Sequence, residues 1–448
     1  MIAWSLGHHP DRFVDPGCGS GRFAASAARR DPALDLIAID LDPIATLLTR
    51  AHLAVVGARS ATVLQADYTT LTLPASPGKT AFVGNPPYVR HHDLSAAAKT
   101  WAVATGRRLG HPVSALAGLH AHFYLATALH ARPGDVGCFV TSAEWIDVGY
   151  GAIIRGLLLN GLGGSHLHIV DPRAVPFSDA MTTAAIACFE VGADVPALRL
   201  RLVESTAQLA SLHSGERVAR AVLRGALRWS PLLPGQVTRM PEAGTIPLRQ
   251  VARVHRGLVT GANRYFVLAR PEARALGLER WCRPVISSAR EIFEARGEIR
   301  STPARKLLLE VPADIDRSCF PELDAYLRRG EQADDGREPI ATRYVTSRRH
   351  PWWFLGPPTA PPLVVTYMAR QAPAFAANPD GLALINIAHG IYPRAPLSAD
   401  RLRDVAAALN GWRESFRGAG RTYHGGLEKF EPGEVERLPV PARLMDPA

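Results

Sequence analysis

The first part of the chain alternates short apolar runs with helical patterns. The apolar runs predict strands, and between them apolar residues recur at three- and four-residue spacing, which predicts helices. The expected strands span 12–14, 34–39, 61–64, 80–83, 136–141, 166–170 and 182–190, and the expected helices span 22–30, 43–56, 119–131 and 150–160. Such alternation is typical of a doubly wound α/β fold with helices on both faces of a sheet.

The rest of the chain lacks this regular alternation of strand and helix patterns. A basic helical pattern, GERVARAVLRGALRW, is followed by a segment rich in proline and glycine, and such a change in composition marks a linker. Beyond it, short strands mix with arginines, tryptophans and proline-rich loops. We therefore expect a first domain over residues 1–192, a linker over 193–245 and a separate α+β domain over 246–448.

Composition and charge narrow the classes of function. The formal net charge is +10, with arginine far outnumbering lysine, which favours a polyanionic partner such as nucleic acid. No apolar run approaches the roughly 20 residues that span a bilayer, and the N-terminus lacks the pattern of a signal peptide. The five cysteines are scattered without metal-ligand spacing. We therefore expect a cytoplasmic protein without a membrane partner or a metal.

The first motif with a chemical signature is DPGCGSG, which ends the first strand and opens a helix. Gly17, Gly19 and Gly21 permit a tight turn and a close approach of the backbone to a ligand. The same geometry binds dinucleotides, but Asp15 would repel a pyrophosphate, whereas it would pair with the amino group of a cationic sulfonium ligand. S-adenosylmethionine is therefore the expected cofactor, held by Asp15, Pro16 and the three glycines.

Carboxylates also follow the second and third expected strands. Asp40 stands near the spacing at which an acidic side chain accepts hydrogen bonds from a ribose. Asp42 before Pro43 is typical of a helix N-cap. Asp67 can accept the exocyclic amine of the cofactor's adenine, and Tyr68 can cover the adenine face. Asp40, Asp67 and Tyr68 thus extend the expected cofactor site.

The segment after the fourth expected strand reads Asn-Pro-Pro-Tyr. An amino group on a nucleobase is a poor nucleophile, because its lone pair is delocalised into the ring. The Asn85 side-chain oxygen and the carbonyl of Pro86, a residue with a rigid φ, could hold both amine protons. Tyr88 could stack on the base, a contact worth about 1 to 3 kcal/mol. Asn85, Pro86, Pro87 and Tyr88 are therefore the expected catalytic residues.

In this order, DPGCGSGRF, AIDLDP, QADY and GNPPY resemble the cofactor and catalytic motifs of the gamma-class (Taq-type) N6-adenine DNA methyltransferases. The resemblance implies a class I S-adenosylmethionine-dependent methyltransferase fold, Rossmann-like with a mixed seven-stranded sheet, and methylation of adenine N6. It gives the residues above the same roles and adds Phe123 and Phe177 as aromatic residues of the target-base pocket.

Segments of the second half are similar to the target-recognition domain of this family's larger members. They are HRGLVTGANRYFVL, SRRHPWWFL, LINIAHGIYPR and YHGGLEKFEPGEVERLPVP. The resemblance implies a double-stranded DNA substrate with a flipped-out base, bound by a monomer associated with the nucleoid. It leaves room for a cognate restriction endonuclease or a defence-system partner. Arg256, Arg264, Arg348 and Arg349 are the expected DNA-binding residues.

Several alternatives stay open from the sequence. Methyltransferases of an RNA base or of protein glutamine also use Asn-Pro-Pro-Tyr, and the chain could be a non-catalytic DNA-binding subunit. Cytosine N4 is chemically accessible, although a serine in place of Asn85 is its usual mark, whereas methylation of cytosine C5 would need a cysteine, typically after a proline, and none here follows one. The family also carries a Thr-Pro cofactor motif upstream of the glycine loop. Because Asp15 lies too near residue 1 for it, we expect either a start codon further upstream or weakened cofactor binding.

Overall fold

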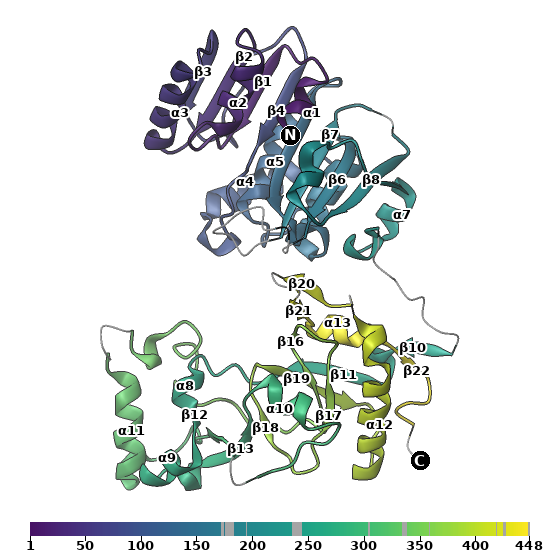
Figure 1. Cartoon of the computed structure of the whole chain (residues 1–448). Coiled ribbons are helices and arrows are strands. Elements are labelled where there is room, and N and C mark those ends of the chain that lie inside the picture. The colour runs from purple at the N-terminus through teal and green to yellow at the C-terminus, as the bar shows by residue number, and fades with distance from the viewer. Residues whose placement is uncertain are drawn as a thin grey trace. The chain divides into compact units, whose positions relative to one another are not determined.

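The computed structural model describes residues 1–171, 174, 183–193, 195–234, 244–302, 305–333, 338–357, 359–417, 419–423 and 427–446. The chain forms two compact units, the first over Met1–Thr238 with Tyr423–Gly425 and the second over Arg239–Thr422 and Gly426–Ala448 (Figure 1). Within the described ranges, no helix has both the length and the apolar character needed to span a bilayer.

The first unit is built on one large sheet with the strand order β3-β2-β1-β4-β5-β7-β6-β8-β9. The strands are β1 (Arg12–Pro16), β2 (Asp35–Asp40), β3 (Ser60–Gln65), β4 (Thr80–Gly84), β5 (Val136–Ser142), β6 (Gly164–Val170), β7 (Ala184–Glu190), β8 (Ala197–Val203) and β9 (Glu216–Ala219). The strands β1 to β5 run parallel, whereas β7 lies antiparallel between β5 and β6. The predicted mixed seven-stranded sheet is therefore present, with β8 and β9 added beyond β6.

Helices cover both faces of this sheet (Figure 1). They are α1 (Ile2–Leu6), α2 (Arg22–Arg30), α3 (Pro43–Val55), α4 (Ala96–Arg108), α5 (Leu119–His130), α6 (Ala152–Leu159) and α7 (Arg220–Gly225). Successive residues of a strand point to opposite faces. Phe13 accordingly packs in one core with Trp4 of α1 and Ala24 of α2, whereas Val14 packs in another core with Tyr124 of α5. Helices on both faces match the doubly wound arrangement predicted from the sequence.

Local signals explain where two of the helices begin. Asp42 caps α3, because its Oδ1 accepts a hydrogen bond of 2.8 Å from the backbone N–H of Ile44, and Pro43 occupies the first helical position, as predicted. Helix α4 was not predicted. Its N-cap is Ser95, whose hydroxyl accepts a hydrogen bond from the N–H of Ala98. Only a narrow face of the helix is buried, so apolar residues recur only weakly at helical spacing in the sequence.

The segment 193–245 does not form only a linker. Strand β8 pairs with β6 and strand β9 pairs with β8, so both belong to the sheet of the first unit. Leu198 and Leu200 are buried and alternate with half-buried Arg199 and Arg201, which is the period of a strand. The basic pattern that suggested one helix is divided between β9 and the short helix α7.

The second unit is an α+β assembly of four small sheets, as the irregular pattern predicted, with strand orders β10-β22, β11-β19-β15-β17, β12-β14-β13-β18 and β16-β21-β20. Its strands are β10 (Thr245–Pro247), β11 (Ala252–Arg256), β12 (Val267–Leu268), β13 (Cys282–Ile286), β14 (Leu307–Leu309), β15 (Leu363–Thr366), β16 (Met368–Ala369), β17 (Phe375–Ala377), β18 (Ala383–Leu384), β19 (Ala388–Pro393), β20 (Arg421–Tyr423), β21 (Leu427–Lys429) and β22 (Pro439–Pro441). Its helices are α8 (Asn263–Phe266), α9 (Arg270–Ala275), α10 (Ala289–Glu294), α11 (Pro321–Glu331), α12 (Ala399–Trp412) and α13 (Pro432–Glu436). It contains hydrophobic cores of its own.

Candidate cofactor and target-base site

The glycine turn after β1 is tied to the end of β2. The backbone N–H groups of Gly17 and Cys18 donate to the Ile39 carbonyl at 2.8 and 2.9 Å, and the N–H of Gly19 donates to Oδ2 of Asp40 at 2.8 Å. Gly17 and Gly19 both have positive φ, which side chains rarely adopt. A Cβ at Gly19 would meet no atom within 4 Å, so a ligand can approach the backbone here.

Asp15 is a fully buried carboxylate with spare hydrogen-bonding capacity. Its Oδ2 accepts a hydrogen bond of 3.1 Å from the N–H of Ala24, whereas its Oδ1 has no partner among the described residues. Burial, and to a smaller extent the nearby charge of Asp40, raise the pKa of Asp15 to about 8, although the hydrogen bond from Ala24 lowers it. A buried carboxylate with an unpartnered oxygen suits a cationic ligand.

The carboxylates Asp40 and Asp67 occupy the ends of the next two strands. Asp40 also accepts from the N–H of Asp42 at 3.0 Å, so it orders the turn that leads into α3. Asp67 is exposed, and its Oδ1 accepts from the backbone and the hydroxyl of Thr69 at 2.9 and 2.7 Å. Leu41, directly after Asp40, is 69% exposed and offers apolar surface that the sequence did not predict.

The role predicted for Tyr68 does not fit its position. The residue is 2% exposed, its hydroxyl is hydrogen-bonded to that of Thr127 at 2.9 Å, and its ring packs on Phe123 with centroids 5.3 Å apart. Tyr68 is therefore a core residue that links the end of β3 to α5, and it does not present a free face to an adenine ring. The contacts with Thr127 and Phe123 come from α5, which is distant in sequence, so the residues around Tyr68 do not indicate its burial.

The Asn-Pro-Pro-Tyr loop leaves β4 with its polar groups free. Asn85 is exposed, and neither its amide nor the Pro86 carbonyl has a hydrogen-bond partner within the described ranges. Tyr88 is 45% exposed. Directly after Tyr88, the carbonyl of Val89 accepts a hydrogen bond of 3.0 Å from the first N–H of α5. This hydrogen bond holds the end of the loop. The loop thus combines free acceptors with an accessible aromatic ring.

The glycine turn and the Asn-Pro-Pro-Tyr loop are in contact. A Cβ at Gly84, the last residue of β4, would lie 3.0 Å from the Pro16 carbonyl oxygen and 3.3 Å from Oδ1 of Asp15. A Cβ at Gly17 would lie 3.4 Å from Cδ of Pro87 and 3.2 Å from the ring of Phe123. The structure therefore brings together both loops and one predicted pocket aromatic, Phe123, whereas Phe177 lies outside the described residues.

The arginines predicted to bind DNA differ in their surroundings. Arg264 is exposed and has no partner among the described residues, and exposed Arg348 lies over the ring of Tyr344, 3.7 Å from its centroid. Arg256 forms an ion pair with Glu431. Arg349 donates to the carbonyls of Val259 and Thr260, and burial lowers its pKa. Arg349 therefore supports a loop, which argues against the phosphate contact predicted for it.

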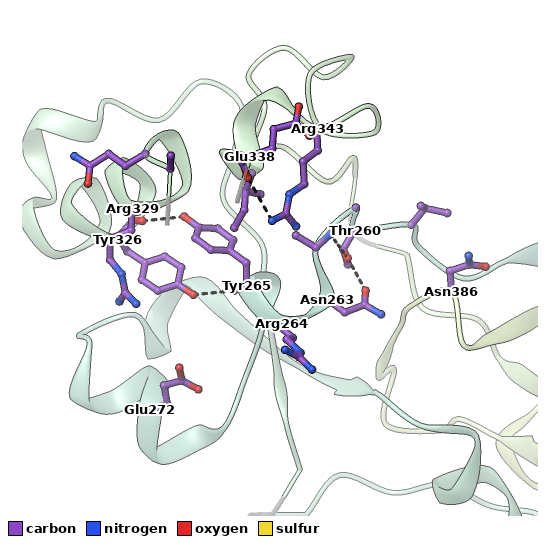
Figure 2. Close-up of a pocket in the computed structure, with 16 residues that line it drawn as sticks. Thr260, Asn263, Arg264, Tyr265, Glu272, Tyr326, Arg329, Glu338, Arg343 and Asn386 are labelled. Atoms are coloured by element: carbon purple, nitrogen blue, oxygen red, sulfur yellow. Dashed lines mark hydrogen bonds between the residues drawn. The ribbon is translucent and has the colours of Figure 1, made fainter. Parts of the chain in front are cut away.

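The second unit also contains a cleft that the sequence did not reveal. Its volume is about 840 Å³, and Figure 2 shows Asn263 and Arg264 near its centre, Arg343 above them and Asn386 to one side. Within the described ranges, no group of three or more histidine, cysteine, aspartate or glutamate side chains could hold a metal ion.

Similarity to known proteins spans the chain. Residues 237–447 match the family described as type II methyltransferase M.Eco57I, C-terminal domain. The type II methyltransferase M.XamI of Xanthomonas campestris pv. amaranthicola is 40% identical over 448 residues, covering 99% of this chain and 83% of the relative. Type II methyltransferase M.AccI of Acinetobacter calcoaceticus is 21% identical, covering 98% of this chain and 82% of the relative.

The solved structure of the type IIL restriction-modification enzyme MmeI in complex with DNA has a similar fold. The TM-score is 0.58 at 16% identity, and the similarity covers 88% of this chain and 58% of that chain. Because the sequence identity is low, this likeness bears on the fold alone. It agrees with the predicted class I methyltransferase fold followed by an α+β region.

Proposed function

This chain belongs to the type II DNA methyltransferase family, and we propose that it transfers the methyl group of S-adenosylmethionine to the N6 amino group of adenine in duplex DNA. The observation that carries the proposal is the contact between the glycine turn and the Asn-Pro-Pro-Tyr loop at Gly17 and Pro87. A cofactor on the turn and a base on the loop would be neighbours. The distance between reacting groups is what such a site must control.

The residues around the glycine turn fit the proposed cofactor. The unpartnered Oδ1 of Asp15 would accept from the cofactor's amino group, and the open space over Gly19 admits its methionine part. Asp40 would accept from the ribose. Asp67 would accept from the adenine amine, and exposed Leu41, instead of Tyr68, would lie against the adenine ring. When bound, the cofactor supplies an electrophilic methyl group.

The Asn-Pro-Pro-Tyr loop would prepare the adenine. A flipped-out base is needed because the amino group cannot be reached inside the duplex. The Asn85 oxygen and the Pro86 carbonyl would accept the two amine protons, which draws the nitrogen lone pair out of conjugation. Tyr88 would stack on the base and Phe123 would support the loop from α5. The side-chain amide at residue 85 favours adenine over cytosine N4, for which a serine is the usual mark.

The second unit would act as the target-recognition domain, since residues 237–447 match the C-terminal domain family. This unit favours a DNA substrate over an RNA base or a protein glutamine. Sequencing of native DNA from cells that express the protein tests the proposal. We expect modified adenines confined to one short sequence, and modified cytosines or unmodified DNA would contradict it. A cognate endonuclease would recognise the same short sequence.

The first prediction concerns the contact between the loops. Gly17→Ala adds a Cβ at φ +67°, 3.2 Å from the Phe123 ring, whereas Gly57→Ala adds one at φ +72° with no atom within 4 Å. Both variants should lose about 1 to 2 kcal/mol of stability from the left-handed backbone. Only Gly17→Ala should also weaken cofactor binding, because its added Cβ crowds the Phe123 ring beside the glycine turn. We expect a loss of affinity of about tenfold or more, and a factor of ten corresponds to about 1.4 kcal/mol. Calorimetric titration of both variants with S-adenosylmethionine measures the difference, and equal affinities would contradict it.

The affinity for the cofactor should depend on pH through the ionisation of Asp15. Because the pKa of Asp15 is raised to about 8 by burial, the carboxyl is mostly protonated at pH 7 in the free protein. A cationic amino group pairs with the ionised form, so binding at pH 7 must release a proton, and affinity should rise between about pH 6 and pH 8. Above that range the ligand's own amino group, with a pKa of about 8, loses its charge. Titrations at pH 7 in buffers of different ionisation enthalpy count the protons, and no release would contradict this role of Asp15.

A further inference from the structure

The cleft of the second unit is formed by several segments that are distant in sequence. One wall is the loop from Val259 into α8, another is α11 with the residues after it, and a third is the segment around Arg343 (Figure 2). Asn386 comes from the turn between β18 and β19. All of these residues belong to the second unit, so its fold alone defines the cleft.

Two sets of contacts hold these walls in place. The hydroxyl of Tyr265 donates to the Tyr326 carbonyl at 2.9 Å, the hydroxyl of Tyr326 donates to the Tyr265 carbonyl at 2.8 Å, and their rings stack at 4.7 Å. The guanidinium of Arg349 donates to the carbonyls of Val259 and Thr260. The cleft is therefore preorganised, which lowers the entropic cost of binding.

The arginines of the cleft lack carboxylate partners. Within the described ranges, neither Arg264 nor Arg329 forms an ion pair, and the guanidinium of Arg343 has one long hydrogen bond of 3.4 Å, to the Glu338 carbonyl. Other arginines of the unit are neutralised: Arg328, beside Arg329 on α11, pairs with Asp324 at 2.7 Å. Glu272 and Glu338 also line the cleft, so its three unpaired arginines outnumber its carboxylates and leave a net positive charge, which favours an anionic ligand.

Two asparagines also line the cleft, and of these Asn263 is exposed. Asn263 accepts from the hydroxyl of Thr260, and its NH₂ group has no partner among the described residues. The side-chain oxygen of Asn386 is buried without a partner. Asparagine amides can bind base edges in the major groove, and arginines can bind phosphates or guanine. The combination suits a nucleic-acid duplex better than a simple anion.

We propose that this cleft contacts duplex DNA, with Arg264, Arg329 and Arg343 binding phosphates or guanine edges and Asn263 reading a base edge. The inference rests on the proposed function, because it gives the target-recognition domain its contact surface. Neither Asn263, Arg329 nor Arg343 was singled out by the sequence.

Fluorescence anisotropy with a labelled 30-base-pair duplex pool of random sequence tests the arginines, at several salt concentrations. We expect Arg264→Ala and Arg343→Ala each to weaken binding and to reduce the slope of log affinity against log salt by about one, and the double variant by about two. The control is Arg290→Ala on α10, because Arg290 is 85% exposed but paired with Glu294. It should bind as the wild type does. Unchanged melting temperatures and cofactor affinity would show that the variants are folded.

The Asn263→Ala variant tests base reading separately. Modified-base sequencing first defines the sequence that the wild type methylates. The substitution of exposed Asn263 should then relax the specificity at one base pair of that sequence. We expect methylation of the sequence mismatched there to rise about tenfold or more relative to the cognate one. If the wild type methylates DNA but the cleft variants bind DNA with the wild-type affinity and salt slope, this inference is overturned. The proposed function would still stand. A wild type that neither binds nor methylates DNA would overturn both.

Discussion

Asn85→Ala is expected to abolish methyl transfer while the protein stays folded and binds its cofactor. The side chain is exposed and has no hydrogen-bond partner in the described part of the chain, so its loss removes no contact that supports the fold. It removes one of the two acceptors proposed to draw the lone pair of the amino group out of the ring. Removing one preorganised hydrogen-bonding group of an active site lowers kcat by about 100- to 1000-fold, and we expect at least that.

Incorporation of labelled methyl groups into DNA under single-turnover conditions measures this loss directly. Asn160→Ala is a matched control, since Asn160 is an exposed asparagine at the end of α6 whose amide donates to the Gly156 carbonyl. It should retain the wild-type rate. If Asn85→Ala instead methylates DNA within threefold of the wild type, the Asn-Pro-Pro-Tyr loop is not the site of the chemistry.

Asp15→Asn is expected to weaken cofactor binding by about 100-fold or more. Truncating one partner of a buried charge pair costs about 2 to 5 kcal/mol or more, and the amide cannot pair with the cofactor's amino group as the carboxylate does. The backbone contact with Ala24 can persist, because the amide oxygen can still accept. Calorimetric titration measures the affinity, and Asp31→Asn, at an exposed aspartate after α2, is the control that should bind normally.

The same variant should not destabilise the protein without cofactor. The folded-state pKa of Asp15, about 8, lies above its ordinary value of 3.8, so its contribution to stability is full below about pH 4 and is lost as pH rises to about 8. Asparagine has no charge to bury, so the melting temperature of Asp15→Asn should fall less than that of the wild type between pH 5 and pH 9. A variant that unfolds at every pH would instead make Asp15 a structural residue.

The sequence predicts the first unit well because its signals are local. The strand period and the glycine turn with its following carboxylates lie within short stretches, and parallel strands bring their carboxyl ends to one edge of the sheet. The contact between Gly17 and Pro87 follows from that topology. The burial of Tyr68 could not be read locally, because it depends on Thr127 and Phe123 of α5.

In the second unit, the surroundings of individual residues could not be predicted from the local sequence. Arg264 and Arg349 look alike in the sequence, yet one is free and the other supports the carbonyls of Val259 and Thr260. Their difference depends on which loops meet in space. The cleft likewise joins segments near residues 263, 329, 343 and 386, and no periodicity in the chain encodes that meeting. The alternating Leu198 and Leu200 of β8 were a readable signal, but the basic pattern after them favoured a linker.

The proposed reaction transfers a methyl group from S-adenosylmethionine to adenine N6 in duplex DNA. The most direct test incubates the purified protein with isotope-labelled S-adenosylmethionine and unmethylated duplex DNA, and then identifies the labelled nucleoside by mass spectrometry after digestion. We expect label in N6-methyladenine alone. Label in a methylated cytosine, or label that stays out of the DNA, would contradict it.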